Sequence, residues 1–247
     1  MITELLQQTP VSTAALLGFG FLIGLKHATE ADHLAAVSTI VAERRSLWAS
    51  MFVGGLWGLG HTISLFFAGI LVLLLDFQIS EGTERWLEFA VGVMLLLLGL
   101  NVIRKVVSGG QVHFHTHDHG PHVHTHPHVH AHEEVHDHIH EPHARGHSPR
   151  ALIIGLIHGM AGSAGLMLLM VPTIDSKAVG LLYIIIFGLG SIGGMMLMSF
   201  LVGLPFHFTA LRFSRFNLVL QVVAGVVSVG LGLYIIFEKG ITEGLLA

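Results

Sequence analysis

Three groups of polar residues interrupt otherwise apolar stretches of the sequence, and their side chains are of types that bind metal ions. The first group, at positions 26–33, reads Lys-His-Ala-Thr-Glu-Ala-Asp-His; the others surround His61 and begin at His158. Imidazole nitrogens with one carboxylate suit borderline divalent ions such as nickel, cobalt and zinc, whereas calcium and magnesium prefer oxygen ligands. There is no cysteine, so thiolate sites are excluded. The predicted ligands are His27, Asp32, His33, His61 and His158.

Other polar residues adjoin the candidate ligands, and ionisable groups at membrane depth are costly unless they are paired, hydrated or bound to metal. The residues expected to balance charge, control access of the ion or support the ligands are Lys26, Glu30, Thr62, Ser64 and Ser191. Three alternatives stay open. A single histidine, such as His61 or His158, can be an interhelical hydrogen-bond partner. Lys26 can pair with Glu30 or Asp32 in a structural network, or the same residues can relay protons.

The first group cannot converge on one ion if its helix is continuous. At 100° per residue, Asp32 lies about 140° and His33 about 240° around the helix from His27. The side chains meet only if the helix is unwound between Thr29 and Asp32, or if neighbouring helices supply the remaining ligands. We predict a broken helix at this point. A comparable break is favoured after His158, where Gly159, Gly162, Ser163 and Gly165 follow, because glycine is a poor helix former.

The composition is that of a protein whose solvent is lipid. Of 247 residues, 52% are hydrophobic and 11% are charged, with a mean hydropathy of +0.73, whereas soluble domains are usually about a quarter charged. The net charge of −4 gives no reason to expect nucleic acid as a partner. Six apolar segments can each cross about 30 Å of hydrocarbon, so we predict an all-α polytopic membrane protein with six transmembrane helices. The segments are 11–42, 47–75, 86–107, 151–171, 179–206 and 216–237.

Lysine and arginine are divided unevenly between the two sets of loops. One side carries Arg44, Arg45, Arg104, Lys105, Arg145, Arg150, Arg212 and Arg215, and the other carries Arg85, Lys177 and Lys239. The positive-inside rule places the first side in the cytoplasm and both termini outside. The first ten residues lack a basic signal region, so we expect a retained N-terminus and an inner (plasma) membrane of a bacterium or archaeon.

The two halves of the sequence resemble each other. Residues 24–27 match 155–158 at an offset of 131, 58–61 match 188–191 at 130, and 98–100 match 231–233 at 133. Chance similarity between glycine- and leucine-rich helices is the alternative. Three spans in each half would make an inverted repeat, as in many secondary transporters. The predicted units are a three-helix repeat at 11–107, a loop at 108–150 and a second three-helix repeat at 151–238.

The loop is rich in histidine, with fifteen in the 35 residues from His113 to His147. Its prolines and its scarcity of aliphatic residues predict disorder. Neutral imidazoles have a free lone pair for a metal ion, so we expect metal capture or buffering on the cytoplasmic face. The residues assigned to capture are His113, His115, His117, His119, His122, His124, His126, His128, His130 and His132.

Deletion of residues 112–147 is expected to lower metal affinity or regulation and to leave the transport path through the helices intact. Metal uptake by cells carrying the deleted protein measures this. Complete loss of uptake by a correctly inserted deletion variant would contradict the assignment of the loop to capture.

The first two polar groups resemble the motifs of the nickel/cobalt transporter (NiCoT) family. Residues 27–33 are similar to its His-x4-Asp-His signature, residues 60–62 to its Gly-His-Ser/Thr motif, and residues 158–163 to its six-span, urease-accessory-type branch. The resemblance implies that His27, Asp32, His33 and His61 take part in metal recognition. The chain departs from the eight-span members in its six predicted spans. It also lacks an Asp-Thr-Ala-Thr-Glu-like motif in the second half, which leaves the metal and the direction of transport open.

The sequence therefore predicts a transporter of nickel or cobalt, with zinc as an alternative cargo, that works by alternating access and is not an enzyme. Its expected partners are the metal ion and the bilayer, with a homo-oligomer or a metallochaperone as further candidates and no bound cofactor. The rivals are a zinc transporter of the ZIP or cation-diffusion type, an intramembrane metal-dependent enzyme, and a metal sensor or store. An enzyme would need a base beside metal-bound water, and the His-Glu-x-x-His spacing is missing.

Overall fold

A computed structural model of the chain describes residues 13–42, 44, 46–75, 80–108, 112–118, 123–129, 149–160, 174 and 176–246. In these ranges the helices are α2 (Thr13–His27), α3 (Ala31–Val41), α4 (Leu47–Leu74), α5 (Glu81–Val107), α6 (Pro149–His158), α8 (Lys177–Arg212), α9 (Ser214–Phe237) and the short π-helix η2 (Glu238–Thr242). Serine side chains cap three of the long helices, with Ser46, Ser80 and Ser176 each accepting a hydrogen bond from a backbone N–H in the first turn. The helical fold class agrees with the prediction.

Four of these helices are long and apolar enough to cross a membrane: α4, α5, α8, and α9 with its extension. The first predicted span is divided into α2 and α3, of 15 and 11 residues, which agrees with the predicted break. Of the fourth predicted span, the structure describes the ten-residue α6, which ends at His158. Residues 161–173, including Gly162, Ser163 and Gly165, lie outside the described residues.

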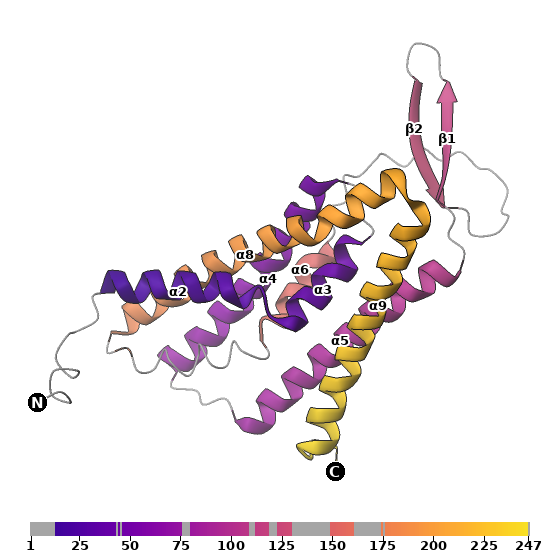
Figure 1. Cartoon of the computed structure of the whole chain (residues 1–247). Helices are drawn as coiled ribbons and strands as arrows, with labels where there is room; N and C mark the ends of the chain where they lie inside the picture. The colour runs from indigo at the N-terminus through magenta and orange to yellow at the C-terminus, as the bar shows by residue number, and fades with distance from the viewer. Residues whose placement is uncertain are drawn as a thin grey trace, which may run out of the picture.

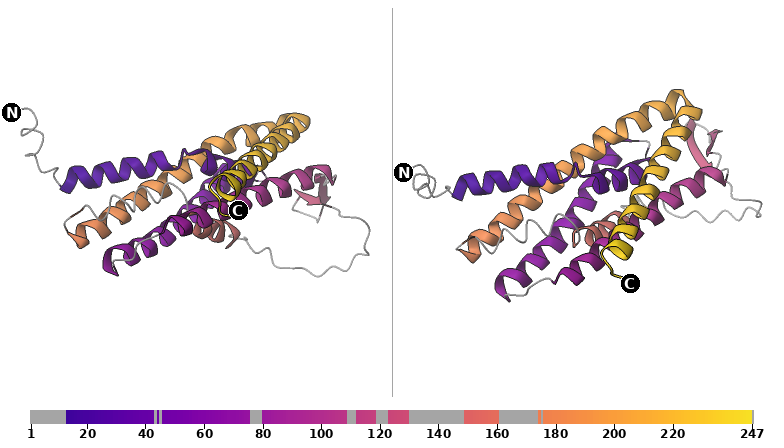
Figure 2. Two further views of the ribbon diagram at one scale, coloured as in Figure 1. Left: turned by 90° about the horizontal axis from the view of Figure 1, so that it is seen from below. Right: turned by 60° about the horizontal axis from the view of Figure 1, so that its bottom comes forward.

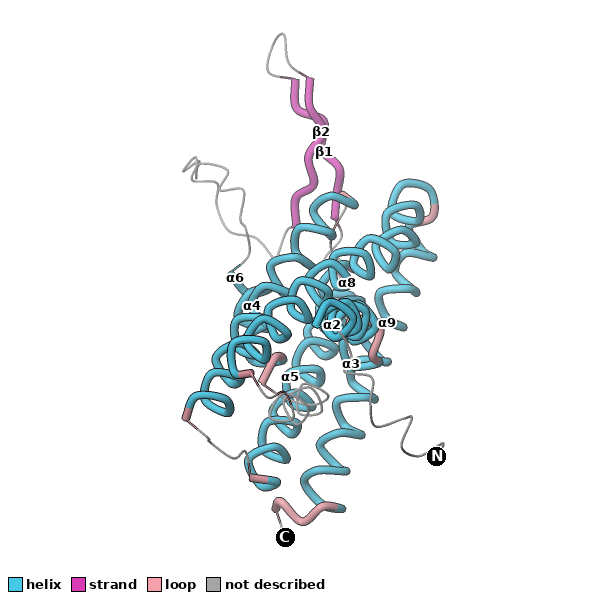
Figure 3. Tube along the Cα trace, turned by 90° about the vertical axis from the view of Figure 1, so that its left-hand side faces the viewer, coloured by secondary structure: helices cyan, strands magenta, loops and turns pink. Residues whose placement is uncertain are grey.

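The histidine-rich segment contains two strands where no regular structure was predicted. β1 (Val112–Asp118) pairs with β2 (Val123–Val129) in an antiparallel hairpin that projects away from the helices (Figures 1 and 3). The alternation of histidine with valine, phenylalanine and threonine explains the difference, because such residues favour strands. The prediction rested on the lack of a packed core. His119, His122, His130 and His132 lie outside the described residues.

The helices pack in a set of close pairs. α8 contacts both α2 and α4, α6 packs on α4, and α5 packs on α9, as Figures 1 and 2 show. The short helix α3 contacts α5, α8 and α9. It therefore lies between the α5–α9 pair and α8.

Glycines allow two of these pairs to approach at the level of their backbones. A Cβ atom on Gly24 of α2 would overlap the carbonyl oxygen of Phe187 in α8, and a Cβ atom on Gly155 of α6 would overlap the carbonyl oxygen of Trp57 in α4. No larger residue fits at either position without moving one helix away from the other. The close approach lets α2 and α6, which end in histidines, lie against α8 and α4.

The exterior of the helices is apolar, while the buried interior contains polar side chains. Phe19, Trp48 and Phe67 are examples of large hydrophobic residues with more than half of their surface exposed. Buried polar residues, among them Ser191 and Ser228, lie inside. This arrangement is expected when the surrounding solvent is hydrocarbon.

Candidate metal centre

The four histidines and the aspartate predicted as ligands lie together, although they come from four helices. His27 ends α2, and Asp32 and His33 lie in the first turn of α3. His61 lies in the middle of α4, and His158 ends α6. All four histidines are buried, with exposures of 0–3%, and the Asp32 side chain is 25% exposed. The structure brings the whole predicted set into one cluster.

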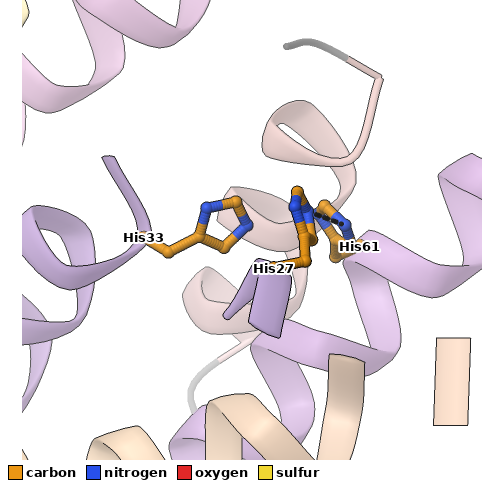
Figure 4. A group of neighbouring side chains, drawn as sticks. All are labelled: His27, His33 and His61. Atoms are coloured by element: carbon orange, nitrogen blue, oxygen red, sulfur yellow. Dashed lines mark hydrogen bonds between the residues drawn. The ribbon is translucent and has the colours of Figure 1, made fainter. Parts of the chain in front are cut away.

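His27, His33 and His61 form a first set of rings that face one another (Figure 4). The Nε2 atoms of His27 and His61 are 3.1 Å apart, and one nitrogen from each of the three rings lies within 4.8 Å of the others. Two nitrogens at that separation can both bind one ion at about 2.1 Å, with roughly 95° between the two bonds. Such an angle suits neighbouring positions of an octahedral or square-planar ion. His27 and His61 are therefore already close enough to bind one cation together.

Asp32, His33 and His158 form a second set that shares His33 with the first. One oxygen of Asp32 is 2.9 Å from Nδ1 of His33, and the other is 3.0 Å from Nε2 of His158. The backbone N–H of His33 also donates to the first oxygen, at 2.8 Å. The carboxylate thus orients two imidazoles, as carboxylates do for histidines that bind metals.

Several buried nitrogens of the cluster have no hydrogen-bond partner among the described residues. They are Nε2 of His33, Nδ1 of His61 and Nδ1 of His158. Buried polar atoms are nearly always paired, and an unpaired one calls for an explanation such as a bound ion. Unpaired nitrogens on three clustered rings are the strongest sign that the cluster has a ligand other than itself.

A break in the first helix produces this arrangement. The side chain and the backbone N–H of Thr29 both donate to the carbonyl oxygen of Lys26, and the backbone N–H of Glu30 donates to that of His27. Glu30 is extended (φ −67°, ψ 152°) and begins α3. As a result, the ring centroids of His27 and His33 are 4.3 Å apart. The predicted unwinding is present, but it spans Ala28–Glu30 and so begins one residue earlier than expected.

The ends of two helices favour a cation at this point. α2 ends at His27 and α6 ends at His158. The C-terminal end of a helix carries a partial negative charge of about half an electron, which attracts positive ions within the last turn. Two such ends and the carboxylate of Asp32 surround the same cluster.

The alternative of an ion pair between Lys26 and the acidic residues is not found in the described part of the chain. Glu30 instead contacts Nδ1 of His27, at 3.2 Å, and Asp32 contacts histidines. Lys26 is exposed. The interpretation of the first polar group as a lysine–carboxylate network therefore has no support in the geometry.

The hydroxyl groups predicted to support the ligands or to control access have different surroundings. Thr62 donates to the carbonyl oxygen of Gly188, which ties α4 to α8, and Ser64 donates to that of His61. The hydroxyl of Ser191 is buried without a partner among the described residues. Thr62 and Ser64 therefore fix backbones, and Ser191 remains a candidate for controlling access.

Trp57 also lines the cluster, although it was not among the residues predicted from the sequence. Its ring centroid is 5.3 Å from that of His33 and 5.5 Å from that of His158, and the residue is 1% exposed. It lies four residues before His61, on the same face of α4, so its helical spacing was the available signal. The indole forms one wall of the cluster and keeps water from His33 and His158.

Comparisons with known proteins were made for the whole chain. It is 36% identical to the urease accessory protein UreH of Bacillus sp. (strain TB-90) over 235 residues, which cover 95% of this chain and 96% of that protein. It is 27% identical to the Chloroplast protein FOR GROWTH AND FERTILITY 2 of Arabidopsis thaliana over 236 residues, 95% of this chain and 59% of that protein. A shorter similarity, 32% over 114 residues, links 39% of this chain to 32% of a high-affinity nickel transport protein of Cupriavidus necator. No protein-family profile and no solved structure matches.

Proposed function

The chain belongs to the family of the urease accessory protein UreH, and from that premise we propose that it is an integral membrane transporter of divalent transition-metal ions, with nickel or cobalt as the cargo. The observation that carries the proposal is the buried cluster of four histidines and one aspartate with unpaired nitrogens. Its nitrogen and oxygen ligands suit these ions. The similarity to a nickel transport protein supports nickel in particular.

We propose that the chain crosses the membrane six times, with the first and fourth crossings built from interrupted helices. The four long apolar helices and the exposed hydrophobic residues support the membrane location. The excess of lysine and arginine on one side supports a cytoplasmic histidine-rich loop and termini outside. Interrupted helices at a central site are typical of secondary transporters.

The proposed architecture is a pair of inverted repeats, and it is supported by contacts that come in equivalent pairs. Gly24 lies against Phe187, and Gly155 lies against Trp57. Gly155 is the counterpart of Gly24 at an offset of 131, and Phe187 is the counterpart of Trp57 at an offset of 130. Each contact therefore becomes the other when its two residues are exchanged for their counterparts in the other half. A two-fold axis that exchanges the halves would produce such pairs.

Further contacts follow the same exchange. Gly60 lies against the carbonyl oxygen of Leu152, and Gly190 lies against that of Phe21, again with offsets of 130 and 131. In the α5–α9 pair, Gly92 contacts Gly232 and Gly99 contacts Gly225. At an offset of 133, the counterpart of Gly92 is Gly225 and that of Gly99 is Gly232, so these two contacts also exchange. The partners run in opposite directions along α5 and α9, as an inverted repeat requires.

In the proposed mechanism, the two ligand sets that share His33 hold the ion in turn. Apart from His33, the residues of the first set come from α2 and α4, and those of the second come from α3 and α6. Binding to the first set replaces the contact between His27 and His61. Transfer to the second set needs only a turn of His33 and separation of Asp32 from its histidine partners. Rocking of the halves then exposes one set to each side of the membrane.

The histidine-rich loop is proposed to capture ions on the cytoplasmic side. The register of the hairpin supports this role, because the Cα positions of His113, His115 and His117 pair with those of His128, His126 and His124. Opposite residues in a strand pair are about 5 Å apart, so each pairing brings two histidines to one place. Several weak sites in a row would raise the local concentration of the ion.

Uptake of radioactive nickel into proteoliposomes containing the full chain tests the proposal. Nickel should accumulate above the level in empty liposomes, cobalt should compete with it, and magnesium should not. Failure of correctly inserted protein to move nickel, cobalt or zinc would contradict transport and would favour a sensor or a store. Efficient transport of magnesium would contradict the proposed histidine ligands.

A further inference from the structure

A second polar cavity lies away from the metal cluster and has the opposite electrostatic character. It has a volume of about 150 Å³ and is formed by the end of α3, the start of α4, the last turns of α5 and the start of α6. Three cationic side chains, Arg44, Lys105 and Arg150, line it together with Asn101 and Thr39. The rest of the described lining is aliphatic, and none of it is acidic.

From this cavity we propose that the protein binds the phosphate group of an anionic phospholipid between α3, α5 and α6. The three cations come from three separate parts of the chain, which the fold brings to one place. Arg44 precedes α4, Lys105 is near the end of α5, and Arg150 is in the first turn of α6. The N-terminal end of α6 adds a partial positive charge, which favours an anion.

The position of the cavity identifies the source of the phosphate as lipid. Lys105 is two residues from the last residue of α5, and Arg44 is three residues before α4, and both helices are candidate spans. The cavity is therefore at the level where a span meets water and where phospholipid headgroups lie. Its aliphatic side suits the glycerol and the first carbons of the acyl chains. Free phosphate would leave that side in contact with water.

A bound headgroup would hold several parts of the fold together at the cytoplasmic end. The histidine-rich segment leaves the helices after α5 and returns at α6, so the bound headgroup would link the two points where the segment joins the helices. The headgroup would also hold the end of α3, the helix that carries Asp32 and His33. The lipid is thus expected to stabilise the folded protein, and this inference does not depend on which metal is carried.

Thermal unfolding of the full chain in detergent, with short-chain phosphatidylglycerol as the probe, tests the site. Phosphatidylglycerol should raise the unfolding temperature, and phosphatidylcholine with the same chains should not. The triple variant Arg44→Gln, Lys105→Gln, Arg150→Gln should need roughly a hundredfold more phosphatidylglycerol, since each cation is worth about fivefold in affinity. The matched control is Arg104→Gln, Arg212→Gln, Arg215→Gln, which removes three exposed cations outside the cavity and should respond as the wild type does.

Three results would overturn the proposal: equal stabilisation by phosphatidylcholine, an equal loss of response in the control variant, and full stabilisation by inorganic phosphate alone. If the triple variant does not fold, the three single variants and the salt dependence of the wild type test the proposal in its place. Each single variant should lose about fivefold in apparent affinity, and sodium chloride should weaken the effect of phosphatidylglycerol. A response that is unchanged in every single variant and by salt would refute an ionic headgroup site.

Discussion

Replacing His33 with alanine is expected to abolish nickel transport while leaving the protein in the membrane. His33 is the one residue that belongs to both ligand sets, with Nδ1 beside Asp32 and Nε2 unpaired in the interior. Loss of a direct ligand should lower uptake by more than about a hundredfold, because loss of an outer partner already costs roughly 10- to 100-fold in affinity or activity. Nickel uptake by proteoliposomes measures this.

The matched control is His207→Ala, which removes a histidine from α8 at a position outside the cluster. It should transport nickel as the wild type does. Gel filtration and the unfolding temperature establish that both variants are folded. If the folded His33→Ala variant takes up nickel within about twofold of the wild type, the loss is much smaller than that expected for a ligand. Such a result would contradict the mechanism in which both sets share His33.

Adding one methyl group at Gly24 or Gly155 is expected to destabilise the protein and to reduce transport. The new Cβ atom would overlap a backbone carbonyl oxygen, of Phe187 or of Trp57, and backbone cannot move aside as a flexible side chain can. Overpacking of this kind costs about 1–3 kcal/mol. The helices that would be pushed away, α2 and α6, end in two of the candidate ligands. The unfolding temperature and nickel uptake should both fall.

Two other helical glycines provide the control. A Cβ atom at Gly18 or Gly230 meets nothing within 4 Å, and both residues lie inside helices. Replacement of a helical glycine by alanine then stabilises by about 0.5–1 kcal/mol, so Gly18→Ala and Gly24→Ala should have opposite effects although both are in α2. Equal stability of the two variants would show that the close approach of α2 and α8 is not required.

The sequence contained enough information to predict the break in the first helix. His27 and His33 could not share an ion on a continuous helix. Ionisable residues in an apolar segment are costly unless they are paired, hydrated or bound to metal, which indicated a site. The structure has the break at Ala28–Glu30 and brings the two rings together. The offset between 24–27 and 155–158 likewise indicated that His27 and His158 are counterparts, and both end their helices.

The partners of each ligand could not be predicted, because they depend on how far apart the helices pack. Nothing in the sequence indicates that the carboxylate of Asp32 reaches His158, or that Nε2 of His27 meets Nε2 of His61. Trp57 was also missed, although its position four residues before His61 placed it on the same face of α4. The hairpin was missed because composition was weighed above the alternation of residues.

The position of α3 gives the cluster a mechanical connection to the rest of the molecule. This short helix carries Asp32 and His33 at its start, and it contacts α8 on one side and the α5–α9 pair on the other. A change in the angle between α8 and that pair would act on α3 from both sides. Such a tilt would displace His33 relative to His61 and His158, which α4 and α6 hold. The angle between α8 and the α5–α9 pair is therefore expected to change the distances between His33 and the other candidate ligands.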